Sequence, residues 1–134
     1  MKEFSYNGEK FTFQWDPANG LVDIKIWGHH TEKDAKEFKK VSEDFLEKFP
    51  EVDPAKMLID SSEQGKLDYE ARRVYTDAIK LPRKAYVAII WKNALVRITS
   101  GFLMAASGRG NLKLFENKEK ALKWLKNIKI DGKE

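Results

Sequence analysis

Residues 85–91 read Ala-Tyr-Val-Ala-Ile-Ile-Trp, and this apolar run decides the fold class. Aromatic and β-branched residues favour a strand, and a strand that is apolar on both faces is typical of a sheet covered by helices on both sides. A shorter run, Met57-Leu58-Ile59, has the same character and precedes Asp60, Ser61 and Ser62. We therefore predict two buried parallel strands, the shorter of which ends at Asp60-Ser61-Ser62.

Upstream of these runs the pattern is that of a β-hairpin. Apolar side chains alternate with polar ones in two segments, with Phe11, Phe13 and Trp15 in the first and Val22, Ile24 and Ile26 in the second. Between them, Asp16-Pro17-Ala18-Asn19-Gly20 supplies a proline and an Asn-Gly pair suited to a chain reversal. The second strand is predicted to end at Gly28, and Phe4 and Tyr6 indicate a short extra strand before Asn7-Gly8.

Four segments have the three-and-four spacing of an amphipathic helix. The first follows the cap residue Thr31, buries Ala35, Phe38, Val41, Phe45, Leu46 and Phe49, and stops at Pro50; the second buries Ala71, Val74, Tyr75, Ala78 and Ile79 and closes at Leu81-Pro82; the third runs from Asn93 to about Ser107; the fourth follows Asn117 and buries Ala121, Leu122, Leu125 and Ile128. A last strand contains Leu112, Leu114 and Phe115.

The resulting order is β-β-α-β-α-β-α-β-α, which predicts a single α/β domain over residues 1–128 and a frayed tail over 129–134. Repeated strand-helix-strand units favour right-handed crossovers and a largely parallel sheet, so the sheet is expected to be mixed, with the opening strand antiparallel to its neighbour.

The charge distribution argues against a nucleic-acid-binding protein. The net charge is +4, and lysines alternate with glutamates along the predicted helices, as on a solvated surface. The chain has no cysteine and therefore no thiolate nucleophile or Cys-based zinc site. The N-terminal residues contain no apolar run of signal-peptide length, so we expect a cytoplasmic protein. We also expect neither a metal nor a cofactor.

Four stretches resemble the SpoIIAA-like family, relatives of the STAS domains of anti-sigma-factor antagonists. They are Ile24-Lys25-Ile26-Trp27-Gly28, Met57-Leu58-Ile59-Asp60, the strand from Lys84 to Ile90, and Leu114-Phe115-Glu116-Asn117 followed by Lys120-Ala121-Leu122-Lys123-Trp124-Leu125. The resemblance implies a non-enzymatic module that engages a protein partner or holds a small apolar ligand.

The same resemblance implies a candidate phosphorylation site. Classical antagonists carry a phosphorylated serine in an Asp-Ser-Ser-Gly-like stretch at the start of the second helix. In this chain Asp60-Ser61-Ser62-Glu63 is similar, which makes Ser61 and Ser62 the candidates. It directly follows the predicted third strand, however, and lies several residues ahead of the second helix.

A second hypothesis comes from the carboxyl ends of the predicted strands, where ligands bind in parallel sheets. His29, His30, Asp60 and Asn93 are expected to gather at that edge, close to Ser61 and Ser62. Such a cluster could serve a hydrolase or transferase. No Gly-x-Ser-x-Gly elbow surrounds either serine, and adjacent histidines rarely bind one metal ion, so we assign neither catalytic nor metal-binding residues.

The predicted contact surface lies between the second and third helices. The third helix is more apolar than one packing stripe requires, and the second offers aromatic and guanidinium groups. We expect Phe102 and Met104 to be the apolar contacts, with Arg72, Arg73 and Tyr75 beside them. A homodimer is a further hypothesis, as is membrane contact through the lysines that surround Trp124.

Overall fold

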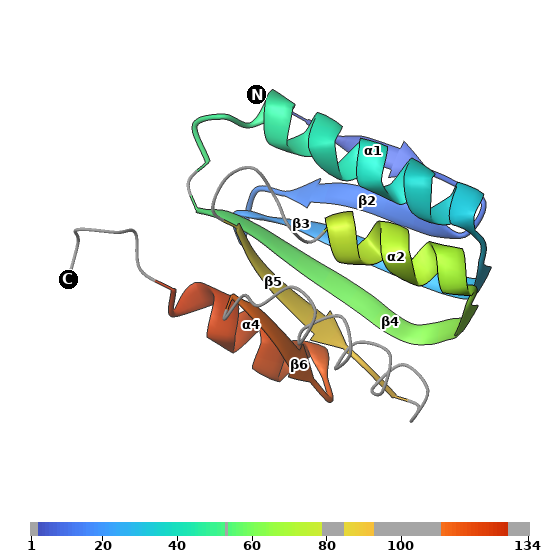
Figure 1. Ribbon diagram of the computed structural model, residues 1–134. Helices are drawn as coiled ribbons and strands as arrows, with labels where there is room; N and C mark the ends of the chain where they lie inside the picture. Colours follow the sequence, from blue (N-terminus) through green and yellow to red (C-terminus); the bar gives the residue numbers. More distant parts are fainter. Residues whose placement is uncertain (1–2, 53, 79–84, 93–110, 129–134) are drawn as a thin grey trace.

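The computed structural model describes residues 3–52, 54–78, 85–92 and 111–128. They form a mixed sheet whose six strands follow one another in sequence order across the sheet (Figure 1). The strands are β1 (Ser5–Asn7), β2 (Phe11–Asp16), β3 (Leu21–His30), β4 (Ala55–Leu67), β5 (Ala85–Ile90) and β6 (Leu112–Phe115). The described helices are α1 (Glu32–Lys48), α2 (Tyr69–Ala78) and α4 (Lys118–Lys126).

The pairing confirms the predicted fold class. β1, β2 and β3 pair antiparallel, whereas β3, β4, β5 and β6 pair parallel. The extra strand expected around Phe4 and Tyr6 is β1. Predictions for the third helix, for the closure at Leu81-Pro82 and for the tail at 129–134 concern residues outside the described ranges.

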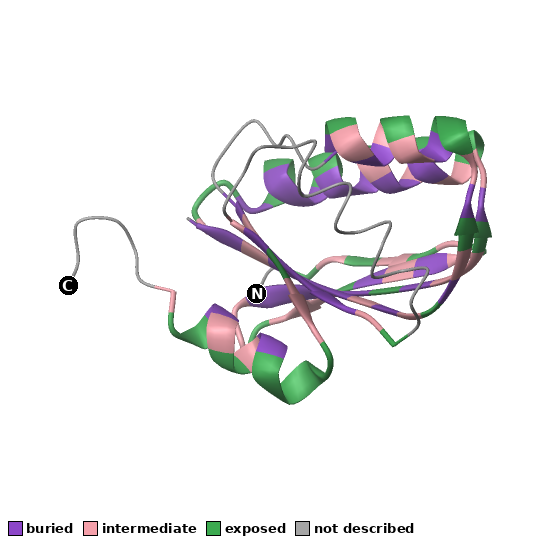
Figure 2. Ribbon diagram, turned by 60° about the horizontal axis from the view of Figure 1, so that its bottom comes forward, coloured by how far each residue is buried: buried purple, intermediate pink, exposed green. Residues whose placement is uncertain are grey.

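Helices cover both faces of the sheet. Figure 2 shows α1 and α2 on one face and α4 on the other. The larger core, on the α1/α2 side, is rich in aromatic rings, including the fully buried Phe11, Phe13 and Phe45. The smaller core, under α4, is built from Leu21, Leu58, Ala88, Ile90, Ala121 and Leu125. β5 contributes side chains to both cores, which explains why its residues are apolar on both faces. The sequence predicts such a strand, covered by helices on both sides.

The predicted hairpin and its turn are present. Gly20 adopts a positive φ of 65°, and its amide donates to the carbonyl of Asp16 at 2.9 Å. The Asn19 side chain also donates to the Asp16 carboxylate, at 2.8 Å, and this bond lowers the pKa of Asp16. Thus Asn19 contributes as a hydrogen-bond donor, and the positive φ belongs to Gly20.

Helix α1 begins as the sequence predicts. Thr31 is its N-cap, and a reciprocal capping box joins the Thr31 hydroxyl to the backbone amide of Asp34 and the Asp34 carboxylate to the backbone amide of Thr31. This box satisfies two amides that would otherwise lack partners at the helix start. It fixes the direction in which α1 leaves the end of β3.

The predicted end of the Met57-Leu58-Ile59 strand, at Asp60-Ser61-Ser62, is wrong. β4 continues through Asp60, Ser61 and Ser62 to Leu67, because two register shifts against β3 insert one extra β4 residue each. The first shift lies between the pairs Lys25–Asp60 and Trp27–Glu63. There the amide of Ser62 donates to the Asp60 carboxylate at 3.0 Å. Asp60 therefore satisfies a β-bulge inside the strand and does not end it.

β3 also runs beyond its predicted end at Gly28, as far as His30. Gly28 has a positive φ of 77°, a conformation that glycine adopts without the steric cost of a Cβ atom. A second register shift follows it, between the pairs Gly28–Gln64 and His30–Leu67. The glycine therefore marks a bulge within the strand.

Candidate functional site

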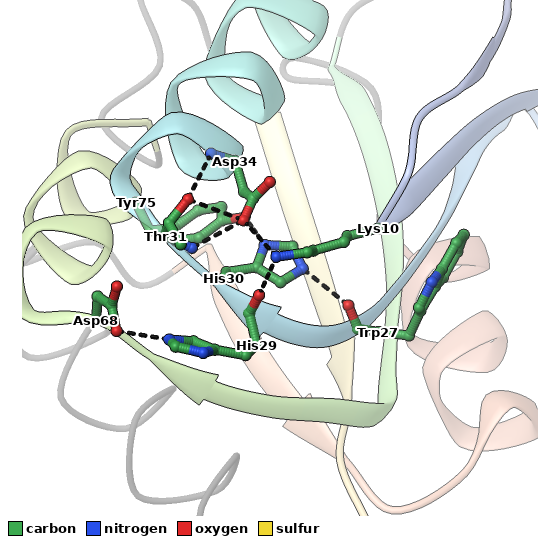
Figure 3. Close-up of polar contacts among 8 residues, drawn as sticks. All are labelled: Lys10, Trp27, His29, His30, Thr31, Asp34, Asp68 and Tyr75. Carbon is green, nitrogen blue, oxygen red and sulfur yellow. Dashed lines mark hydrogen bonds and ion pairs between the residues drawn. The ribbon is translucent and has the colours of Figure 1, made fainter.

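The carboxyl ends of β3 and β4 meet at one edge of the sheet, where α1 and α2 both begin. His30 pairs with Leu67, the last residue of β4, and the amide of Asp68 donates to the His30 carbonyl at 3.0 Å. Figure 3 shows the polar side chains that gather there, which come from β3, from the start of α1, from α2 and from the segment before β2.

His30 lies in the interior and both of its ring nitrogens are bonded. Its side chain is fully buried, with Nε2 3.1 Å from the carbonyl of Trp27 and Nδ1 2.7 Å from the hydroxyl of Tyr75. A carbonyl can only accept, so Nε2 carries the proton and Nδ1 accepts from Tyr75. Burial lowers the pKa of His30 and raises that of Tyr75, which favours the neutral form of both rings.

His29 points the other way, toward solvent. Its Nε2 lies 2.6 Å from Oδ1 of Asp68, and both side chains are about half exposed. The pair joins the end of β3 to the residue that precedes α2 (Figure 3). In such an exposed pair, solvent screens the attraction, so its contribution to stability is on the order of 1 kcal/mol or less.

Lys10 ties the segment before β2 to the same edge. Its Nζ donates to the His29 carbonyl at 2.5 Å and to the Asp34 carboxylate at 2.9 Å. Burial alone would raise the pKa of Asp34, but the Thr31 amide and Lys10 outweigh it and hold that pKa at about 2. Asp34 is therefore a charged carboxylate that is already fully engaged by its neighbours.

The sequence-predicted cluster at this edge is only partly correct. His29 and His30 lie there, but Asp60 is paired with Lys25 and Ile90, and it precedes Leu67 by about 20 Å of strand. The predicted gathering of Asp60 with the histidines is therefore wrong, because β4 is longer than its apolar core. Asn93 lies outside the described residues. Asp68, which sequence reasoning missed, is the acidic residue that meets His29.

The two serines differ in access. Ser61 is 2% exposed, whereas Ser62 is half-buried and its amide is bonded to Asp60. Both lie within β4, well before the helix start at Tyr69. A kinase could reach the Ser62 side chain more readily than that of Ser61.

The predicted contact residues on α2 point in different directions. Tyr75 is buried, and its ring packs edge-on against Phe38 with centroids 5.3 Å apart. Arg73 is exposed and lies 3.8 Å from Glu70, while Arg72 is half-buried. Phe102 and Met104 lie outside the described residues. We call the exposed group formed by His29, Asp68, Tyr69, Arg72 and Arg73 the carboxyl-end surface.

The Thr31 hydroxyl and the acidic side chains at this edge bear on whether it could be a catalytic or a metal site. The Thr31 hydroxyl donates to Asp34 at 3.0 Å and also caps α1, which leaves it poorly placed to act as a nucleophile. No group of three or more His, Asp or Glu side chains suited to a metal ion occurs among the described residues. Nor is any described helix long and apolar enough to cross a membrane.

Comparison with known proteins gives a family and a fold. A model for a domain of unknown function, DUF7793, matches residues 19–129. No curated protein matches the sequence. Among solved structures, the chain is similar to an uncharacterized protein of the DUF3478 family from Shewanella loihica PV-4 that has a SpoIIAA-like fold; the TM-score is 0.60, the identity 21%, and 92% of each chain is covered. This likeness confirms the predicted SpoIIAA-like fold, and at that identity it extends to the fold alone.

Proposed function

This chain belongs to the DUF7793 family, and we propose that it is a non-catalytic module that binds a protein partner through the carboxyl-end surface. The observation that carries the proposal is the state of the polar groups at this edge. His30, Thr31 and Asp34 each use their side-chain atoms to hold β3, α1 and α2 together. Their role is to build a rigid edge, and a rigid edge suits recognition.

A protein partner suits this surface better than a small apolar ligand. The aromatic rings of the larger core pack against one another; Trp15 and Phe49, for example, stack with centroids 4.5 Å apart. By contrast, Tyr69 is 69% exposed and is the one large hydrophobic side chain of the described residues with such exposure. Tyrosine and arginine are the residue types that interface centres favour.

Site-specific photo-crosslinking in the native host tests this proposal. Tyr69 is replaced by p-benzoylphenylalanine, a change that its exposure tolerates, and the same replacement at the exposed Lys123 of α4 serves as the control on the opposite face. We expect a discrete crosslinked protein from position 69, identified by mass spectrometry together with its crosslinked residue. Identical products from both positions, or no product at position 69, would contradict the proposal.

The competing hydrolase or transferase hypothesis has its own test. Among the described residues, the exposed His29–Asp68 pair is the histidine–carboxylate group at this edge that a substrate could approach. We expect no turnover of ester, phosphoester or peptide substrates above background. Activity that disappears in His29→Ala but persists in Lys123→Ala would overturn the non-catalytic assignment.

Phosphorylation at Ser62 would give this module a switch. A phosphate there would lie beside Asp60, and like charges about 4 Å apart repel by roughly 1 kcal/mol in water. Phosphopeptide mapping in the native host should find modified Ser62 and unmodified Ser61. If Ser62 is unmodified in every growth state, the switch is wrong and the binding proposal stands unchanged.

A further inference from the structure

The first turns of α2 contain one aromatic residue and two arginines. Tyr69, Arg72 and Arg73 stand three and four residues apart, so their side chains are neighbours on the helix surface. Tyr69 is highly exposed and Arg73 is 67% exposed, while Arg72 is half-buried. The group lies next to the His29–Asp68 pair, at the edge where parallel sheets bind their ligands.

Arg72 is the member of this group with an unmet hydrogen-bonding need. Its Nε is buried and has no hydrogen-bond partner among the described residues. A buried donor without an acceptor destabilises the fold, and more so when the group is charged. The fold therefore carries a cost at Arg72, which an incoming acceptor would remove once the half-buried side chain turns toward it.

The nearby carboxylates are already engaged elsewhere. Asp68 bonds to His29 at 2.6 Å, and Asp34 bonds to Lys10 and to the Thr31 amide. Glu70 lies 3.8 Å from Arg73, in an exposed pair that water screens. Among the described residues, no acceptor meets Arg72 Nε, and Arg73 can exchange its weak partner for a better one.

We propose that Arg72 and Arg73 bind a carboxylate of the protein partner, with Tyr69 packing against an apolar side chain next to that carboxylate. Arginine binds a carboxylate through two parallel hydrogen bonds, which fixes orientation as well as adding affinity. The partner segment therefore has an Asp or Glu close to an apolar residue. This inference rests on the proposed function and names the chemistry of its partner.

The surrounding charge favours a single carboxylate over a polyanion. Between Asp68 and Ala78 the chain has three carboxylates, Asp68, Glu70 and Asp77, and two arginines. A nucleic-acid backbone or an anionic membrane requires a surface on which positive charge is in excess. This segment has no such excess, so it suits a partner whose negative charge is confined to one group.

The test uses the whole chain and a random-peptide phage library as the probe. Peptides selected on the immobilised protein should be enriched in an Asp or Glu next to an apolar residue. Each selected peptide is then measured by fluorescence anisotropy against its amide counterpart, in which Glu becomes Gln or Asp becomes Asn. We expect the amide form to bind about 10- to 100-fold more weakly, the loss typical of a charged hydrogen bond. Added salt should weaken the acidic peptide more than the amide peptide.

Matched variants locate the contact. Arg72→Met keeps the apolar stem and removes the charge, so it should reproduce the loss seen with the amide peptide. Lys126→Met removes one positive charge from the exposed side of α4 and should leave the affinity unchanged. Tyr69→Ala should weaken binding, because it removes the ring that packs against the apolar side chain of the peptide. Circular dichroism and the guanidinium midpoint of each variant show whether its fold is retained.

The outcomes separate this inference from the proposed function. Selected peptides without acidic residues, or a loss of less than about threefold in Arg72→Met, would overturn the carboxylate contact. If position 69 still crosslinks to a protein in that case, the binding module stands and only its chemistry is wrong. If position 69 gives no crosslink and no peptide is selected, both are wrong.

Discussion

Tyr75→Phe removes a single buried hydroxyl and tests the account of how the edge is held together. In the wild-type chain this hydroxyl donates to Nδ1 of His30 at 2.7 Å, and His30 is fully buried. The substitution leaves Nδ1 as a buried acceptor without a donor, which costs about 1–3 kcal/mol. The ring remains, so its contact with Phe38 is retained and no large cavity forms.

Guanidinium denaturation followed by circular dichroism measures this loss as a change in the free energy of unfolding. Tyr69→Phe is the matched control because it removes the same atom from an exposed side chain, and its effect should stay within about 0.5 kcal/mol. If Tyr75→Phe also falls within that limit, the His30–Tyr75 bond does not stabilise the edge and the reasoning is refuted.

The same bond predicts a pH dependence. Because burial lowers the pKa of His30, the folded chain binds a proton there only below the ordinary value of about 6.5, whereas the unfolded chain binds it near that value. At a pH between the lowered pKa of the folded chain and the ordinary pKa of the unfolded chain, unfolding therefore takes up a proton. Stability falls as the pH falls through this window. Above about pH 6.5 the full stability is present. His30→Gln should remove this part of the pH dependence, and an unchanged acid slope in that variant would contradict the assignment.

Three further pairs of substitutions test local features by the same denaturation assay. Gly28→Ala should cost about 1–2 kcal/mol because of its positive φ, and Gly28→Asn should cost less; equal losses would point to packing instead. Asp34→Ala should cost about 1–2 kcal/mol because it removes the Asp34 half of the capping box, whereas the exposed Asp44→Ala should cost less than about 0.5 kcal/mol. In the wild-type chain, the stability that the Asp34 carboxylate contributes should disappear as the pH falls from about 4 to 2. Ser61→Glu should cost about 3–5 kcal/mol because it buries an unpaired charge, whereas Ser62→Glu should cost about 1; the reverse order would mean that the two serines are misplaced.

Features with a local signal were predictable from the sequence. The β2–β3 hairpin follows from period-two alternation and from the residues of its turn, and α1 follows from Thr31, Asp34 and a regular apolar stripe. Asn117 was expected to cap the last helix, and its side chain accepts from the amide of Lys120 at 2.9 Å. In each case the residues that encode the feature lie within a few positions of one another.

The length of β4 was not predictable in this way. After Ile59 the buried positions recur every third residue, at Ser61, Gln64 and Leu67, because the bulges break the alternation. Polar residues and a glycine in that pattern are typical of a loop, and sequence reasoning treated them so. Their pairing with β3 is a long-range property that no local signal in this segment encodes.

These bulges also decide which acidic residue reaches His29. If the register at Lys25–Asp60 continued without a shift, His30 would pair with Gly65, and Asp68 would lie beyond the end of β3. The two extra residues in β4 bring Leu67 opposite His30, so that Asp68 bonds to His29 and α2 begins directly beside α1. Tyr75 then reaches His30, and Tyr69, Arg72 and Arg73 face solvent at the same edge. The carboxyl-end surface is thus a consequence of strand register, which is why the sequence indicated His29, Arg72 and Arg73 singly but neither Asp68 nor the assembled surface.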